Sequence, residues 1–269
     1  MPALRKNYLA MTGIALLFII FLMAAIGPSI SGYTYYDTHL ESKNFPPSPQ
    51  FWFGTDDLGR DLFTRVCYGA RISLFVGISA ALIDLIIGVC WGGIAGFMGG
   101  DIDSILMRIA DILYAIPSLL VVVLLTVIFQ PGIITIVLAM AILGWITMAR
   151  IVRGQILELK QREFVLAATA LGAGFGRIFF KHLIPNAMGP VLVTVTYTIP
   201  TAIFMEAFLS FLGLGVQAPI ASWGTMASEA LAALEYYPWR LFFPTLFISM
   251  TMFSFNIIGD QLNSFNEAI

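Results

Sequence analysis

Long, nearly uninterrupted apolar runs dominate the chain and predict membrane-spanning helices. A helix needs roughly 20 apolar residues to cross a hydrocarbon core about 30 Å thick. Six runs meet this requirement, at about residues 8–30, 72–98, 112–130, 132–151, 188–213 and 241–260. The pattern therefore predicts an all-α, polytopic membrane protein with six transmembrane helices.

The positive charges between the runs predict the orientation, because cytoplasmic connections carry an excess of Lys and Arg. With the amino terminus inside, nine of the 14 Lys and Arg residues fall inside. Both termini are then cytoplasmic, as is the connection over 153–187. The expected organisation is a first transmembrane helix (1–30), an extracytoplasmic loop (31–71), a five-helix core (72–262) and a cytoplasmic tail (263–269).

Composition supports this class and excludes others. Hydrophobic residues make up 59% of the chain and charged residues only 11%, against about 25% charged in soluble domains. The mean hydropathy is +0.89. A net charge of −2 argues against a nucleic-acid partner, which requires a basic face. The sequence contains no GxxxxGK[ST] phosphate loop, catalytic triad or metal-ligand cluster, so neither a catalytic residue nor a cofactor is expected in this chain.

A polar, glycine-punctuated segment, Glu163 to Asn186, separates two of the apolar runs. Its first half favours a helix over 164–171 that ends at Gly172, since glycine costs about 1 kcal/mol inside a helix. A second short run over 177–183 leads to Pro185, which suits the first turn of another helix. Small residues at Ala167 and Ala168 allow another backbone to approach closely. The alternative is an ordinary amphipathic connecting loop.

The spacing of Ala167-Ala168, Gly172 and Ile184-Pro185 resembles the cytoplasmic coupling loop of bacterial ABC importer permeases. In that family the loop docks into a cleft of the ATP-binding subunit. Leu166 and His182 depart from the general pattern, as they do in the dipeptide and oligopeptide branch, where an acid lies three residues earlier, as Glu163 does. The resemblance implies that Glu163, Ala167, Ala168, Gly172, Ile184 and Pro185 form the coupling loop.

The predicted outer loop carries a second motif, GTDDLGRDLFTR followed by GARISL, over 54–74. It is similar to the segment before the second span in permeases of peptide and nickel importers. Thr55 or Asp56 is expected to cap a short helix, and Arg60, Arg65 and Arg71 to pair with carboxylates. We interpret the motif as a structural clamp that faces the binding protein, or as a satisfied surface turn without a substrate role. Its residues are Gly54, Thr55, Asp56, Gly59, Arg60, Asp61 and Arg71.

Four polar residues inside the runs are candidates for a translocation path. An ionised carboxylate within the bilayer must face protein, water or a partner helix. Asp84 lies within the second run, Glu206 and Ser210 lie four residues apart in the fifth, and Asn256 lies in the sixth. Glu206 is the leading candidate for the pore, with pairing at a permease–permease interface as the alternative. Gly88, Gly92 and Gly96 predict a tight helix contact.

The resemblance implies a type I ABC importer permease in the bacterial inner membrane that translocates di- and oligopeptides. The implied partners are a second, non-identical permease, two ATP-binding subunits that hydrolyse ATP, an extracytoplasmic binding protein and membrane lipid. Nickel or another small solute is the alternative substrate. The residues alone also leave open a proton-coupled carrier or channel in which Asp84 and Glu206 take up and release protons.

Overall fold

The computed structural model describes residues 2–266, and helices form the fold of this part of the chain. Five helical segments are long and apolar enough to cross a membrane, and a bent pair of helices can supply a sixth crossing. The elements in chain order are α1 (Pro2–Ile30), η1 (Leu40–Ser42), α2 (Leu62–Met98), α3 (Gly100–Tyr114), α4 (Ser118–Phe129), α5 (Ile133–Leu143), α6 (Trp145–Leu159), α7 (Glu163–Ala170), α8 (Phe175–Arg177), η2 (Ile178–Leu183), α9 (Ile184–Phe211), α10 (Trp223–Leu231) and α11 (Trp239–Asn266).

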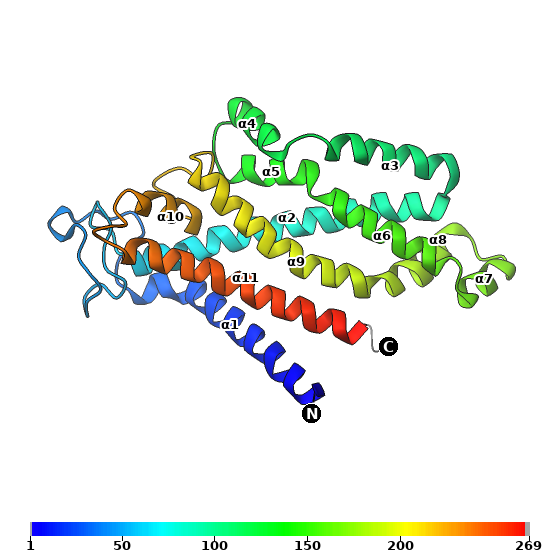
Figure 1. Cartoon of the computed structure of the whole chain (residues 1–269), viewed down its shortest axis with the longest axis horizontal. Helices are drawn as coiled ribbons and strands as arrows, with labels where there is room; N and C mark the ends of the chain where they lie inside the picture. Colours follow the sequence, from blue (N-terminus) through cyan, green and yellow to red (C-terminus); the bar gives the residue numbers. More distant parts are fainter. Residues whose placement is uncertain (1, 267–269) are drawn as a thin grey trace.

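The long helices run along the long axis of the molecule, and its two ends differ (Figure 1). The segment over 31–61 and α10 lie at one end, which we call the outer end. The short helix α7 lies at the opposite end, which we call the α7 end. The chain-terminal ends of α1 and α11 point toward the half of the molecule that carries α7.

The central helix is α2, which contacts α1, α3, α5, α6, α9, α10 and α11. Gly92 lies so close to α6 that a Cβ atom there would overlap the Ala149 carbonyl group. A Cβ atom at Gly96 would lie 2.9 Å from the carbonyl oxygen of Arg153. The tight contact predicted from the glycine spacing is therefore confirmed, and α2 and α6 form a closely packed pair.

The third predicted span, 112–130, is not one straight helix. α3 and α4 meet at an angle of 76°, and the break lies before Pro117, which has no N–H and disfavours helical geometry in the preceding residue. α4 has 12 residues, or about 18 Å at 1.5 Å per residue. The more polar α3 is tied to α6 instead, through Asp103 with Arg153 (2.5 Å) and Asp111 with Arg150 (2.8 Å).

The second span begins earlier than its hydropathy indicates. α2 starts at Leu62 rather than at the predicted residue 72, and its 37 residues exceed the roughly 20 that a crossing requires. The Asp61 side chain accepts a hydrogen bond from the Thr64 N–H at 2.8 Å and so caps the helix. The extra turns lie within the outer end, where the loop residues cover them.

Candidate coupling face, outer loop and translocation cavity

α7 is a short helix with a closed C-terminal end. The Gly172 N–H donates to the Thr169 carbonyl at 2.9 Å, and the Ala173 N–H donates to the Ala168 carbonyl at 3.0 Å. Gly172 has φ +78°, a left-handed conformation that glycine adopts without strain. The predicted end of the helix at Gly172 is therefore confirmed.

One buried side chain anchors α7 to the bundle. Val165 belongs to a core cluster that also contains Met148, Val152, Ile156, Ile178, Phe179, Leu183, Ala187 and Val191. These residues come from α6, from the π-helical turn η2 and from α9. η2 continues directly into α9, with Pro185 in the first turn. A displacement of α7 therefore reaches α6 and α9 through side chains in direct contact.

The connection into α7 is also attached to the end of α2. Lys160 follows α6, and its Nζ donates to the Phe97 carbonyl at 2.6 Å. Phe97 lies in the last turn of α2, where carbonyl groups lack helical partners. The lysine thus links the segment before α7 to the central helix.

Large apolar side chains are exposed on and beside α7. Leu171 is 88% exposed and Leu166 is 56% exposed. Exposed apolar patches mark sites of interaction with a partner or a membrane. Among the predicted coupling residues, Glu163, Ala167, Gly172 and Pro185 are exposed, and Ala168 and Ile184 are half-buried.

At the outer end, the loop is organised around the Asp56 carboxylate. Asp56 accepts hydrogen bonds from the N–H groups of Leu58 and Arg60 at 2.9 Å each, and it pairs with Arg60 Nε at 2.5 Å and Arg65 Nε at 3.5 Å. Both arginines also reach Glu229 of α10, at 3.2 and 2.8 Å. The buried cations are therefore neutralised within the subunit. Glu229 was not predicted, because it is distant in the chain from both arginines and has no local signal in the sequence.

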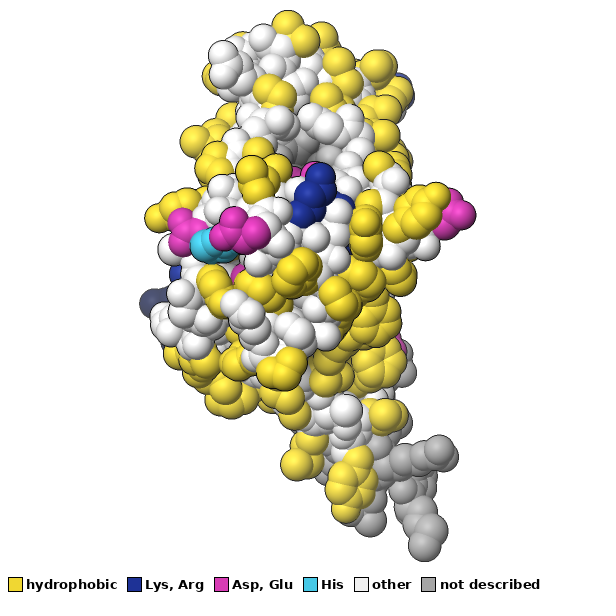
Figure 2. Space-filling model, turned by 90° about the vertical axis from the view of Figure 1, so that its left-hand side faces the viewer, with side chains coloured by type: hydrophobic (Ala, Val, Ile, Leu, Met, Phe, Trp, Pro, Cys, Tyr) yellow, Lys and Arg dark blue, Asp and Glu magenta, His cyan; other side chains and the backbone are white. Residues whose placement is uncertain are grey.

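The other motif residues fix the path of the loop. The Thr55 hydroxyl accepts from the Phe45 N–H at 2.8 Å. Gly59 has φ +73°, and a Cβ atom there would overlap the His39 carbonyl group. Gly54 packs closely against Phe45 and Trp239. Figure 2 shows this end, with Lys and Arg near the middle of the face and Asp and Glu to either side, among hydrophobic side chains.

Two expectations for this loop were wrong. No helix begins at Thr55 or Asp56, because Asp61 caps the next helix, α2, and is itself paired with Thr55 through an isolated bridge. Burial raises the pKa of the Asp61 carboxyl, while the hydrogen bonds from Thr64 lower it. Arg71 binds no carboxylate among the residues that the structure describes. Its guanidinium donates to the carbonyls of Ala24 and Ala25 on α1, at 2.5 and 2.8 Å.

Glu206 and Ser210 lie in a closed polar cluster inside the bundle. Glu206 has no exposed surface and accepts hydrogen bonds from Ser210 at 2.8 Å and from Ser73 of α2 at 3.1 Å. The Trp223 N–H, at the start of α10, donates to the same Ser73 hydroxyl at 3.3 Å. Glu206 thus joins α2, α9 and α10, and in this conformation it faces no open path.

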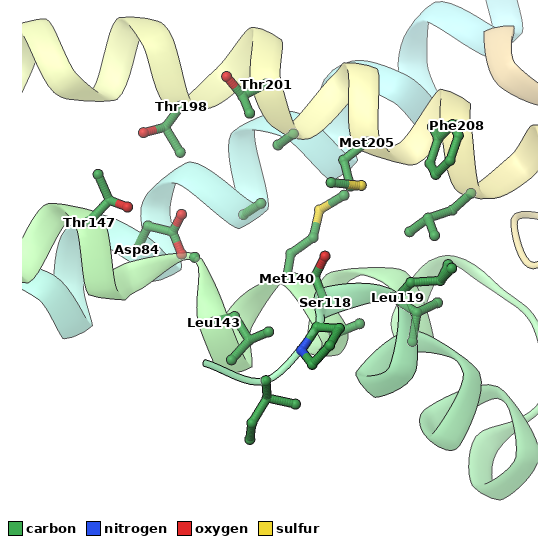
Figure 3. A pocket seen from close by; sticks show the side chains of 18 of the residues that line it. Asp84, Ser118, Leu119, Met140, Leu143, Thr147, Thr198, Thr201, Met205 and Phe208 are labelled. Atoms are coloured by element: carbon green, nitrogen blue, oxygen red, sulfur yellow. The ribbon is translucent and has the colours of Figure 1, made fainter. Parts of the chain in front are cut away.

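Asp84, in contrast, lines a cavity of about 530 Å³ between α2, α4, α5, α6 and α9. Only 4% of the residue is exposed, and its Oδ1 atom is buried without a hydrogen-bond partner. The side chain lies against Gly144, where α5 and α6 are interrupted. Figure 3 shows Asp84 beside Thr147 at one end of the cavity. Asn256 is exposed on α11 and does not line this cavity.

Comparison with known proteins defines the class of this architecture. Residues 88–267 match the family described as "Binding-protein-dependent transport system inner membrane component", and residues 3–47 match the "N-terminal TM domain of oligopeptide transport permease C". The oligopeptide transport system permease protein OppC of Bacillus subtilis is 61% identical over 96% of this chain and 85% of its own length. The dipeptide transport system permease protein DppC of the same organism is 56% identical, over 96% and 81%.

A solved structure shares the fold. The MetNI methionine ABC transporter, in an inward-facing conformation, matches 76% of this chain and 95% of its own chain, with a TM-score of 0.63 at 17% identity. The fold is therefore that of a type I ABC importer permease. The chain belongs to the family of binding-protein-dependent transport system inner membrane components, the permease components of ABC transporters. Membership implies ATP-binding subunits and a partner permease.

Proposed function

We propose that the chain is one of two non-identical permease subunits of an ATP-driven importer of di- and oligopeptides. The support is the identity of 61% and 56% to permeases named for oligopeptide and dipeptide transport, over nearly the whole chain. ATP hydrolysis takes place in two separate ATP-binding subunits. An extracytoplasmic binding protein delivers the substrate at the outer end, and the α7 end with both termini faces the cytoplasm.

The observation that carries the coupling role is the exposed apolar surface around α7. Leu171 and Leu166 are 88% and 56% exposed in this subunit, and α7 lies at one extreme end of the molecule (Figure 1). The small side chains of Ala167 and Ala168 leave room for the wall of a cleft. Docking of α7 into the ATP-binding subunit buries this surface and so supplies the partner that the isolated chain lacks.

In the proposed mechanism, α7 transmits movement of the ATP-binding subunits to the helices. Val165 connects α7 to α6 and α9, and Lys160 connects the preceding segment to α2. Because α2 and α6 are in close backbone contact, they move as one body when α7 is displaced. Rigid-body movement of packed helices about a fixed site is an established form of alternating access.

Gly172 provides a direct test, because a Cβ atom there would meet no atom within 4 Å in the part of this subunit that the structure describes. We expect Gly172→Arg to abolish ATP-dependent peptide uptake in proteoliposomes while membrane insertion is unchanged, since the arginine clashes only with a docked partner. Gly172→Ala introduces the same backbone strain without the bulk and is expected to retain most of the uptake. Normal uptake and normal binding of ATP-binding subunits by Gly172→Arg would contradict the coupling role.

The same preparation separates an importer from a proton-coupled carrier. The importer requires ATP, both ATP-binding subunits and the binding protein for uptake. A carrier takes up substrate when this chain alone is reconstituted and a proton gradient is applied. Gradient-driven uptake by the isolated chain would therefore exclude the proposed function.

A further inference from the structure

The cavity beside Asp84 has one polar end and one apolar end (Figure 3). Thr147, Thr198 and Thr201 lie on the same side as Asp84. Met140, Met205 and Phe208 lie toward the opposite side. Its volume of about 530 Å³ falls within the range of about 300–1,000 Å³ that is usual for small-ligand sites. Methionine side chains adapt to differently shaped neighbours, so the apolar end suits groups of varied shape.

The polar end presents hydrogen-bond acceptors. The Thr198 hydroxyl already donates to the Thr194 carbonyl at 3.0 Å, and the Thr201 hydroxyl donates to the Tyr197 carbonyl at 2.7 Å. Their oxygen lone pairs are left as acceptors, alongside the Asp84 carboxylate. Within the described part of the chain, no Lys, Arg or His lines the cavity. This end is complementary to a cationic group that only donates, such as an ammonium group.

The Asp84 carboxylate is unusual because this subunit leaves it unpaired. Its Oδ1 atom is buried without a hydrogen-bond partner among the residues that the structure describes, whereas Glu206 is held by two serines. Burial of a carboxylate without a partner destabilises a fold. Gly144 makes room for it, since a Cβ atom there would lie 2.5 Å from both carboxylate oxygens. The chain therefore retains an acidic side chain that its own packing does not use.

We propose that Asp84 binds the positively charged amino terminus of a peptide in transit, while the side of the cavity with Met140, Met205 and Phe208 receives a peptide side chain. The proposal rests on the proposed peptide import and names the residue that recognises one end of the substrate. The competing occupant is a basic side chain of the partner permease, and the test below distinguishes the two.

The test uses the complete complex without binding protein, so that recognition by that protein does not contribute. Thr201→Cys places a reporter thiol on the cavity wall, and Cys90, the exposed native cysteine, is replaced by Ala. The rate of thiol labelling is measured against increasing trialanine and against N-acetyl-trialanine, which lacks the ammonium group. The same titrations are made with Asp84→Asn added, and with Asp101→Asn as a control that removes an exposed acid at the start of α3.

We expect trialanine to slow labelling and N-acetyl-trialanine to have no effect at the same concentration. Asp84→Asn raises the trialanine concentration for half-maximal protection about tenfold or more, the usual effect of losing a hydrogen bond to a charged group. Asp101→Asn leaves it unchanged. Asp84→Asn also raises the thermal unfolding midpoint, because it removes an unpaired buried charge. If Asp84 had a purely structural role, Asp84→Asn would instead lower the thermal unfolding midpoint.

Two results would overturn the proposal: equal protection by the two peptides, and unchanged protection in Asp84→Asn. If unchanged protection is accompanied by reduced recovery of the partner permease, Asp84 belongs to the subunit interface. Binding-protein-dependent uptake of trialanine by the unmodified complex is measured in parallel. If that uptake is present and either result is found, only the Asp84 assignment fails; if it is absent, the proposed function fails.

Discussion

The outer end and the α7 end differ in whether their side chains find partners within the subunit. At the outer end, Arg65 is 1% exposed, and its charge is met by Asp56 and Glu229 from within the same subunit. At the α7 end, Leu171 is 88% exposed and has no such cover. The buried arginines of the outer end therefore have their counterions within the isolated chain, while the exposed Leu171 is covered, under the proposed function, by another protein. Substitutions at the two ends should differ accordingly in whether they lower stability or function.

Arg65→Met should have the largest effect on stability. It leaves the Asp56 carboxylate buried with one of its two arginines missing, and breaking a buried ion pair costs about 3–5 kcal/mol. Unfolding of the purified subunit in detergent measures the loss. The matched substitution at the α7 end is Arg162→Met, whose partner Glu158 is 58% exposed and whose loss should cost at most about 1 kcal/mol. Equal losses would remove the distinction between the two ends.

The pair Gly59→Ala and Gly172→Ala sharpens the comparison, because both glycines have nearly the same φ, +73° and +78°. Left-handed geometry costs each alanine about 1–2 kcal/mol. Only at Gly59 does the new methyl group also overlap a carbonyl group, that of His39, which adds about 1–3 kcal/mol. Gly59→Ala should therefore show the lower unfolding midpoint. A lower midpoint for Gly172→Ala would indicate that α7 is held more tightly than its contacts suggest.

Glu206→Gln should destabilise the subunit by about 1–3 kcal/mol, the cost of leaving a buried partner unsatisfied. The new amide group presents N–H donors toward Ser73 or Ser210, which both now donate to the carboxylate. Stability is again measured by unfolding in detergent. Uptake per correctly folded complex should be unchanged, and a selective loss of uptake would restore Glu206 to the translocation path.

Leu171→Ser should have the smallest effect on stability, within about 0.5 kcal/mol, because the side chain touches little of this subunit. The substitution should instead weaken assembly, which is measured as a smaller amount of ATP-binding subunit recovered with the permease. Unchanged assembly would mean that Leu171 is not covered by this partner.

The sequence was sufficient for the class of fold, because the length of an apolar run reports directly on whether it can cross a bilayer. It was insufficient where packing against distant residues decides. The start of α2 at Leu62 depends on the loop that covers its first turns. The bend between α3 and α4 lies at Pro117, and side-chain pairs hold α3 against α6. Neither feature has a signature in hydropathy.

The same limit applies to the polar candidates. The spacing of Glu206 and Ser210 correctly placed them on one face of α9, but spacing does not say which neighbour that face meets. That neighbour is Ser73 of α2. Glu229 was missed because its partners Arg60 and Arg65 lie far away in the chain. Asp84 was a candidate from its type alone, and only the cavity distinguishes it from an acid paired inside the subunit.

The length of α2 has a geometric consequence. Its 37 residues form a single rod of about 55 Å at 1.5 Å per residue, whose final turn is joined to Lys160 and whose first turns carry Arg65. A tilt of about 5° at one end of such a rod shifts the other end by roughly 5 Å. Under the proposed function, a small tilt imposed on α2 at the α7 end would therefore become a displacement of several ångströms at the outer end.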